Sequence, residues 1–267
     1  MKFTKMHGTG NDFIVINAIE EKLPKDLSVL SKKIADRHFG IGADQVLVVD
    51  KSRKADFKMI IFNNDGSQVE MCGNGIRCLA RYVFEKGLTK NKHIEVETLG
   101  GIVKPQINGS RVSVNMGIPK FDTKDWKTKE TINREFKING KTFRISLISV
   151  GNPHCVIFVD RITNEMVHLY GPKIENSSSF PNRINVEFAR IINDSEIEMR
   201  VWERGTGETL ACGTGATATV IAAIKNKLTA NKVTVRLLGG DLEIEWNGKE
   251  VYMSGPAEFV FEGQIEI

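Results

Sequence analysis

The chain carries one short motif twice, as Met71-Cys72-Gly73-Asn74-Gly75 and as Ala211-Cys212-Gly213-Thr214-Gly215. In both copies a cysteine precedes a glycine-rich turn, and the turn leads into a run with helical character, 76–86 or 216–227. The first N–H groups of a helix have no partner within the helix, and the helix dipole is positive there. We therefore expect both cysteines to lie where a thiolate or a carboxylate is stabilised, and at least one thiol to have a lowered pKa.

The two motifs belong to an internal repeat that covers most of the chain. Matching anchors recur in order at offsets of 139 to 141 residues, among them Gly10-Asn11 with Gly151-Asn152. This period is far too long for a solenoid repeat. The sequence therefore predicts two copies of one domain, residues 1–117 and 118–256, and a tail, 257–267, that packs back onto the first copy.

Short β-branched runs bounded by turn residues dominate both copies, as at 46–49 and 57–62. Helices are expected only at 27–37, after the two cysteines and at 164–170. The predicted fold class is α+β, with two pseudo-symmetric halves, each a curved, mostly antiparallel sheet wrapped around a central helix.

Asn-Gly pairs begin at Asn108, Asn139 and Asn247, between segments of alternating polarity. They predict two-residue hairpins, since type I′ turns need positive φ at both central positions. Gly8-Thr9-Gly10 does not follow a predicted strand, so it is interpreted as a turn and not as a nucleotide-binding loop.

Composition excludes several classes of protein. The net charge of +4 is mild and the lysines are scattered, so no nucleic-acid partner is expected. No apolar run approaches 18 residues, and the start of the chain lacks a signal-peptide core, which predicts a cytoplasmic protein without a membrane partner. None of the four cysteines has C-x-x-C spacing, so no metal site is expected, and Cys78 and Cys155 are interpreted as small buried apolar residues.

Two matched cysteines suit one kind of reaction. If an approximate two-fold axis relates the copies, Cys72 and Cys212 face each other across a cleft. One thiolate can then remove a proton from a stereogenic carbon while the other thiol delivers a proton to the opposite face. Backbone N–H groups of Gly73, Asn74, Gly213 and Thr214 would stabilise the charge that develops on a neighbouring carboxylate. No cofactor is expected, because no Schiff-base lysine or nucleotide motif is evident.

Other polar residues pair up through the repeat. Asn11 matches Asn152, Gln45 matches Asn185 and Asn63 matches Glu203. Each alone is most often a turn residue, but the pairing indicates that both copies direct polar groups at one cleft. Arg204 is either part of a surface ion pair or a carboxylate clamp, and its place before the second motif favours the clamp. His154 fits a structural role and a site role equally well.

Eight stretches together resemble the diaminopimelate epimerase family: 5–13, 40–45, 62–67, 70–78, 151–155, 183–188, 202–205 and 211–215. The resemblance implies a cofactor-independent epimerase that interconverts LL- and meso-2,6-diaminopimelate, in lysine and peptidoglycan precursor synthesis. It also implies a fold of two pseudo-symmetric halves with the active site in the cleft between them, and a homodimer. Asn64 departs from the family, in which alanine is common at this position, and no change of function is expected from it.

The family's roles fall on matching positions. Cys72 and Cys212 resemble the two bases, and the amides of Gly73-Asn74 and Gly213-Thr214 are implied to bind the reacting α-carboxylate. The side chains implied to hold the charged groups of the substrate are Asn11, Gln45, Asn63, Asn152, Asn185, Glu203 and Arg204. Within this set Arg204 is implied to bind the distal carboxylate, and His154 is implied to lie near the catalytic centre. The two motifs look nearly equivalent, so the sequence does not say which cysteine acts on which isomer.

Three alternatives remain open at this point. Proline racemases and hydroxyproline epimerases use similar bases but need no clamp for a distal carboxylate, while phenazine-type isomerases lack the cysteine pair. An amino-acid-binding protein would explain a cleft but not two matched thiols. Two further expectations are that the halves close around the ligand to exclude water, and that the empty site can oxidise to an inactive Cys72–Cys212 disulfide.

Overall fold

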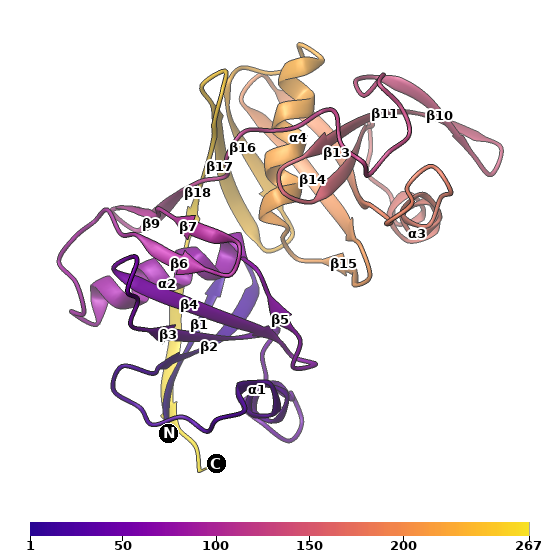
Figure 1. Cartoon of the computed structure of the whole chain (residues 1–267). Coiled ribbons are helices and arrows are strands. Elements are labelled where there is room, and N and C mark those ends of the chain that lie inside the picture. Colours follow the sequence, from indigo (N-terminus) through magenta and orange to yellow (C-terminus); the bar gives the residue numbers. More distant parts are fainter. Residues whose placement is uncertain (267) are drawn as a thin grey trace. The chain divides into compact units, whose positions relative to one another are not determined.

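The computed structural model describes residues 1–266, and the chain divides into two compact units. Unit 1 comprises Met1–Asn115 and the C-terminal segment from Ser254, and unit 2 comprises Met116–Met253 (Figure 1). The boundaries predicted from the repeat lie a few residues further along the chain. The mixed α+β class and the repeated architecture are confirmed.

Unit 1 is built on one sheet with the strand order β19-β1-β2-β3-β4-β6-β7, and β5 pairs with β4 at one side. Neighbouring strands are antiparallel except β2 with β3 and β4 with β6. The tail supplies β19, which pairs with β1. The strands of this sheet are β1 (Lys2–Gly8), β2 (Asn11–Asn17), β3 (Gln45–Asp50), β4 (Phe57–Asn63), β5 (Gln68–Val69), β6 (Val96–Thr98), β7 (Gly101–Val103) and β19 (Glu258–Gln264). The strands β8 (Gln106–Asn108) and β9 (Arg111–Asn115) form a hairpin that does not belong to this sheet.

Unit 2 repeats this plan with the order β10-β11-β12-β13-β14-β16-β17-β18, and β15 pairs with β14. The parallel pairs are β12 with β13 and β14 with β16, at the places equivalent to those of unit 1. The strands are β10 (Arg134–Ile138), β11 (Lys141–Ser149), β12 (Pro153–Phe158), β13 (Asn185–Asn193), β14 (Glu196–Glu203), β15 (Gly207–Thr209), β16 (Lys232–Leu237), β17 (Gly240–Trp246) and β18 (Val251–Pro256).

The pairing register repeats between the units. Phe13 lies opposite Gln45 in unit 1, and His154 lies opposite Asn185 in unit 2. The repeat that the sequence shows is therefore kept at the level of individual residue pairs. This register places Gln45 and Asn185 at equivalent ends of their sheets.

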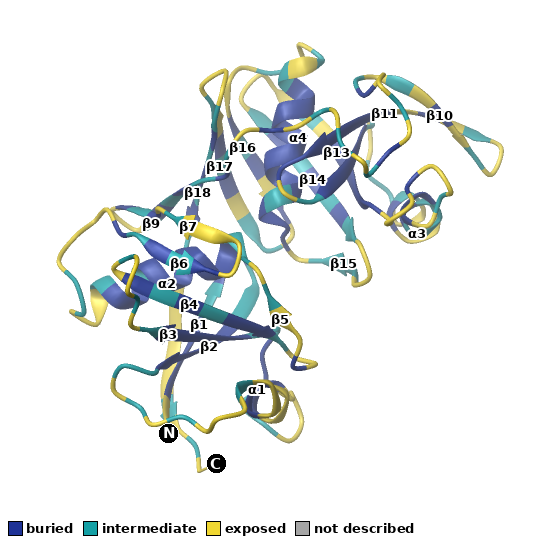
Figure 2. Ribbon diagram, viewed as in Figure 1, coloured by how far each residue is buried: buried dark blue, intermediate teal, exposed yellow. Residues whose placement is uncertain are grey.

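One long helix packs on each sheet, α2 (Gly73–Glu85) in unit 1 and α4 (Gly213–Lys225) in unit 2. Both are buried along most of their length (Figure 2). The helix α2 buries apolar side chains such as Leu79 and Val83, which recur at helical spacing, and the chain leaves it through Gly87 at φ +71°. The helix α4 uses small residues such as Ala218 and Ala222 for the same purpose.

Shorter helices lie at the periphery. The helix predicted at 27–37 is α1 (Leu27–Ala35), capped by Asp26, which accepts from Val29 N at 3.1 Å. The helix predicted at 164–170 continues further, as a π-helical segment (Met166–Tyr170) followed by α3 (Gly171–Glu175).

The turn predictions need correction. Gly8-Thr9-Gly10 does follow a strand, β1, and Thr9 and Gly10 form the tight turn to β2 with φ 52° and 84°. Asn139-Gly140 is a two-residue turn with positive φ, as predicted. A two-residue hairpin also forms at the first Asn-Gly pair, but its central residues are Gly109-Ser110, since Asn108 pairs with Arg111. The prediction at Asn247 is wrong, because Asn247 begins a longer loop in which its side chain accepts from Glu250 N.

Candidate active site

Half-site 1 is the group of polar residues around the start of α2. Cys72 is the N-cap of that helix, and its Sγ accepts from Gly75 N at 3.5 Å. The Cys72 thiol donates to Asn11 Oδ1 at 3.6 Å, and Asn74 Nδ2 donates to the same oxygen at 3.3 Å. Three residues from the predicted site set are therefore in direct contact in unit 1.

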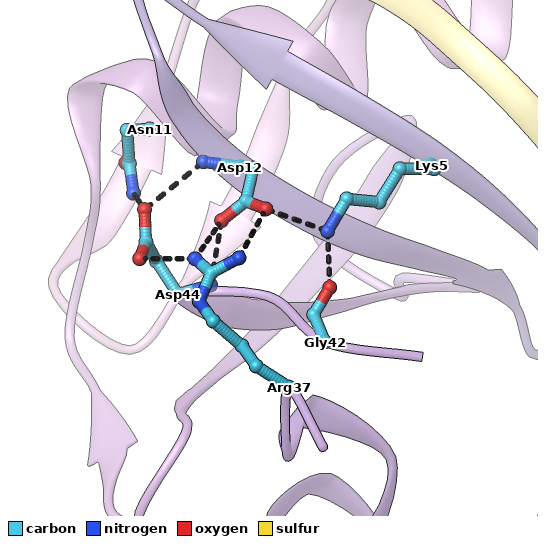
Figure 3. Close-up of polar contacts among 6 residues, drawn as sticks. All are labelled: Lys5, Asn11, Asp12, Arg37, Gly42 and Asp44. Atoms are coloured by element: carbon cyan, nitrogen blue, oxygen red, sulfur yellow. Dashed lines mark hydrogen bonds and ion pairs between the residues drawn. The ribbon is translucent and has the colours of Figure 1, made fainter. Parts of the chain in front are cut away.

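An ion-pair network binds the amide NH2 group of Asn11 (Figure 3). Asn11 Nδ2 donates to Asp44 Oδ2 at 3.0 Å, and Arg37 bridges Asp44 and Asp12 at 2.8 Å each. Lys5 also donates to Asp12, at 2.6 Å, and to the carbonyl of Gly42. Because a carboxylate only accepts hydrogen bonds, Asp44 binds the NH2 group of Asn11 and turns the oxygen of Asn11 toward Cys72.

Electrostatics within this network favour ionised carboxylates. Burial raises the pKa of Asp12, but hydrogen bonds from Arg37 and Lys5 outweigh it and bring the pKa down to about 2. Asp12 is therefore ionised at neutral pH.

Arg77 is a buried cation beneath half-site 1. It is fully buried on α2 and bonds the carbonyls of Pro256 at 3.2 Å and Gly73 at 3.3 Å. Burial lowers the pKa of Arg77 to about 10, while the charges of Cys78 and Cys72 raise it. A buried guanidinium at this place favours negative charge on Cys72.

Gln45 and Asn63 form a second contact in unit 1. Gln45 Nε2 donates to Asn63 Oδ1 at 2.9 Å, and Asn63 Nδ2 donates to Ser67 Oγ at 3.0 Å. These residues begin β3 and end β4, so the antiparallel register brings them together.

Half-site 2 is the equivalent group around the start of α4. Cys212 is the N-cap, and its Sγ accepts from Gly215 N at 3.3 Å and lies 3.4 Å from Thr214 Oγ1. Burial raises the pKa of the Cys212 thiol well above its usual range, and the charges of Glu203 and Glu187 raise it further. The expectation that helix starts lower thiol pKa values is therefore wrong for Cys212, because burial outweighs the helix dipole.

Glu203 lies beside Cys212 at the end of β14. Burial raises the pKa of its carboxyl, against hydrogen bonds with Thr209 and Cys212 that lower it. Glu203 and Cys212 are therefore two neighbouring acids that both resist ionisation.

His154 connects Asn152 to a buried carboxylate. Its Nδ1 lies 2.6 Å from Glu187 Oε1, and its Nε2 lies 3.0 Å from Asn152 Oδ1. Asn152 Nδ2 donates to Thr214 Oγ1 at 3.2 Å. A continuous set of hydrogen bonds therefore runs from Glu187 through His154 and Asn152 to Thr214, which contacts Cys212.

Asn185 and Arg204 are placed together at the ends of β13 and β14. Asn185 Oδ1 accepts from Arg204 N at 2.9 Å, and Asn185 Nδ2 donates to Pro153 O at 2.9 Å. The Arg204 side chain is exposed and donates to Asn182 O at 3.2 Å. The exposed guanidinium of Arg204 can be reached by a ligand.

Sequence reasoning missed several residues that organise the half-sites. Glu187 stands in the apolar strand β13, where the matching residue of unit 1 is Leu47, so comparison of the repeats could have found it. Arg77 could have been found as a charge on the apolar face of a helix. Asp44 lay within a matched stretch but carried no separate signal.

The other two cysteines take no part in these contacts. Cys78 and Cys155 are fully buried, and burial raises both thiol pKa values, to about 12 for Cys78. Within residues 1–266, no group of three or more metal-ligating side chains could hold an ion. No helix in that range is long and apolar enough to cross a membrane.

The fold is shared with several proteins of known structure. One similar structure is a PhzF-family phenazine biosynthesis protein from Bacillus anthracis, with TM-score 0.72, 17% identity, and coverage of 100% of this chain and 99% of the other. Another is a probable proline racemase from Agrobacterium radiobacter, with TM-score 0.72, 15% identity and coverage of 100% and 93%. At these identities the likeness concerns the fold alone.

Sequence similarity identifies the family of this chain. A family model described as diaminopimelate epimerase matches residues 3–121 and 146–260. The chain is 48% identical to the diaminopimelate epimerase of Moorella thermoacetica over 278 aligned positions, covering 100% of both chains. It is 47% identical to that of Acetivibrio thermocellus, covering 100% of this chain and 99% of the relative. The chain belongs to the diaminopimelate epimerase family.

Proposed function

We propose that this chain interconverts LL- and meso-2,6-diaminopimelate without a cofactor, using Cys72 and Cys212 as two bases. The observation that carries the proposal is that the two cysteines cap equivalent helices in the two units of a chain of this family. The activity would serve the synthesis of lysine and of peptidoglycan precursors.

The chemistry is a proton exchange at the α-carbon. One thiolate takes the α-proton, so that an S–H bond forms as the C–H bond breaks. The electron pair spreads into the neighbouring carboxylate, and the opposite thiol gives its proton to the other face of the carbon. The first cysteine ends as a thiol and the second as a thiolate. Cys212, with its raised pKa, holds a proton at rest and suits the role of proton donor.

The charge on the carboxylate needs preorganised donors. The first N–H groups of α2 and α4, at Gly73-Asn74 and Gly213-Thr214, lack intrahelical partners and lie at positive helix ends. We assign them to the reacting α-carboxylate. The side chains assigned to the remaining polar groups of the substrate are Asn11, Gln45, Asn63, Asn152, Asn185, Glu203 and Arg204.

The distal carboxylate of diaminopimelate distinguishes it from proline. Arg204 is exposed at the rim and can form a bidentate pair with a carboxylate. His154, held by Glu187, supports half-site 2 from beneath. The two-base proposal requires that both half-sites contact one substrate and that water is excluded during the reaction. We further propose that the enzyme is a cytoplasmic homodimer.

Isotope exchange tests the proposal. Reduced protein is incubated with LL-diaminopimelate in deuterium oxide without added cofactor, and deuterium uptake and the meso isomer are followed. We expect both in the wild type, and a loss of at least about a hundredfold in Cys72→Ser and Cys212→Ser, the scale of one missing acid or base.

Other outcomes point elsewhere. Uptake with proline or hydroxyproline, but not with diaminopimelate, would reassign the substrate. Binding of diaminopimelate without any uptake would leave a binding protein and overturn the enzymatic proposal.

A further inference from the structure

A buried histidine–carboxylate pair lies directly beneath the turn that carries Cys212. His154 on β12 and Glu187 on β13 are both fully buried, and Nδ1 lies 2.6 Å from Oε1. The start of α4 rests on this pair, since a Cβ added to Gly215 would lie 2.8 Å from Glu187 Oε1. Glycine is therefore required here for close approach of the helix to the carboxylate.

The pair is not needed to form the fold. The residues of unit 1 at the equivalent positions are Phe13 and Leu47, which are also fully buried. Burial of ionisable groups is costly, and apolar residues of similar size usually replace them without loss of stability. Unit 2 keeps the polar pair, although Glu187 Oε2 is buried without a hydrogen-bond partner among the described residues. The free-energy cost of burying this pair therefore indicates that it serves a purpose other than packing.

The hydrogen bonds fix where the protons lie. Asn152 Oδ1 only accepts, so His154 Nε2, 3.0 Å away, carries a hydrogen. A hydrogen must also lie between His154 Nδ1 and Glu187 Oε1, because two lone pairs only 2.6 Å apart would repel each other. Asn152 then offers its NH2 group to Thr214 Oγ1. A hydroxyl that accepts this bond keeps its own hydrogen for Cys212 Sγ, 3.4 Å away.

We propose that Glu187 is a positioning residue for Cys212. With Glu187 present, one hydrogen lies between His154 Nδ1 and Glu187 Oε1 and another lies on Nε2, and the Nε2 hydrogen orients the Asn152 amide and directs the Thr214 hydroxyl at the sulfur. The role of this relay in turnover rests on the proposed function, whereas the order of its hydrogen bonds does not. The ionisable groups that face Cys212 are Glu203 from β14 and Glu187 from β13, with His154 from β12 bonded to Glu187.

Without Glu187, a neutral imidazole carries a single hydrogen, which can lie on either nitrogen. A hydrogen on Nδ1 leaves a lone pair on Nε2, which repels Asn152 Oδ1 and favours the flipped amide. The flipped amide accepts from Thr214, and the hydroxyl hydrogen is then withdrawn from Cys212. This chain of consequences predicts a loss of turnover with little change in substrate binding.

The first readout is the imidazole nitrogen spectrum of the whole protein. We expect a persistent Nε2–H on His154 in the wild type, and loss or mixing of this tautomer in Glu187→Leu. Glu187→Gln keeps the volume and can still bond Nδ1, so it should lie between the two. Glu175→Gln is the matched control, because Glu175 is also buried in unit 2 but bonds Trp202 Nε1 and Gly205 N instead. An unchanged His154 spectrum in both Glu187 variants would overturn the proposal.

The second readout is a double-mutant cycle on turnover. Glu187→Leu and Thr214→Val should each lower kcat by about a hundredfold, with KM within about threefold, as a misplaced catalytic group does. If the two residues act through one relay, the double variant is no slower than the slower single variant. Multiplied losses, or full kcat in Glu187→Leu, would overturn the relay. Wild-type protein that does not exchange the α-hydrogen counts against the proposed function instead, and the spectrum still reports on Glu187.

Discussion

Half-site 1 and half-site 2 descend from one repeat, yet they hold their equivalent asparagines by opposite chemistry. In half-site 1 the anchor is Asp44, an acceptor, which binds the NH2 group of Asn11 at 3.0 Å. In half-site 2 the anchor is His154, a donor, which binds the oxygen of Asn152 at 3.0 Å. Asn11 therefore presents an acceptor to its cysteine motif, whereas Asn152 presents a donor.

The charges around the two thiols differ as well. A buried cation, Arg77, lies beneath half-site 1, and the position equivalent to it on α4 is Thr217. Carboxylates, Glu187 and Glu203, lie near Cys212 and raise its pKa. The two motifs, which look nearly equivalent in sequence, thus differ in electrostatics. Duplication kept the backbone that places a cysteine at each helix start, while the residues beneath it diverged.

Removal of the acceptor anchor should disturb half-site 1 most. Asp44→Ala frees the Asn11 amide to rotate and leaves Arg37 with one carboxylate partner from this network. We expect kcat/KM for epimerisation to fall by about a hundredfold, the usual cost of misplacing a catalytic group. Steady-state kinetics with diaminopimelate measure this.

A graded control accompanies this variant. Asp44→Asn keeps the shape but can donate as well as accept, so it should lose about tenfold, or about 1.4 kcal/mol of transition-state stabilisation. Equal activity of Asp44→Ala and the wild type would show that Asp44 does not set the Asn11 orientation.

The backbone of the two half-sites can be predicted from the sequence, whereas their hydrogen bonding and charge can be predicted only in part. Matched Cys-Gly-x-Gly motifs at a constant offset predicted the two helices and their caps, because a helix start depends on local residues. Whether each asparagine presents its oxygen or its NH2 group depends on residues that are distant in sequence and meet through strand register. These residues are Asp12 and Arg37 in half-site 1 and Glu187 in half-site 2. Burial at Cys212 likewise follows from packing, so a local argument from the helix dipole gave the wrong direction for its pKa.

Acid should weaken unit 1 through Asp12. Hydrogen bonds from Arg37 and Lys5 depress its folded-state pKa to about 2, below the value near 3.9 of an unfolded chain. The folded state then binds fewer protons, so the stabilisation is present above about pH 4 and is lost as pH falls toward 2. The full shift corresponds to about 2.6 kcal/mol.

Thermal unfolding between pH 2 and pH 6 measures this contribution. Asp12→Asn should melt lower than the wild type at pH 6 and should lose less stability on acidification. If the melting temperatures of the two proteins fell in parallel between pH 6 and pH 2, Asp12 would not be the cause of the loss of stability in acid. No equivalent effect is expected in unit 2, where Pro153 takes the place of Asp12.

The smallest effect is expected at Asn64, to which no role in the site is assigned. Its backbone N–H donates to Asp44 O at 3.1 Å, and its side chain is exposed. Asn64→Ala keeps the backbone bond, so kcat/KM should stay within about twofold, since exposed substitutions away from special features change stability by under about 0.5 kcal/mol. A larger loss, measured beside Asp44→Asn, would mean that the Asn64 side chain helps to hold Asp44. The support of half-site 1 would then extend beyond the ion-pair network to the turn after β4.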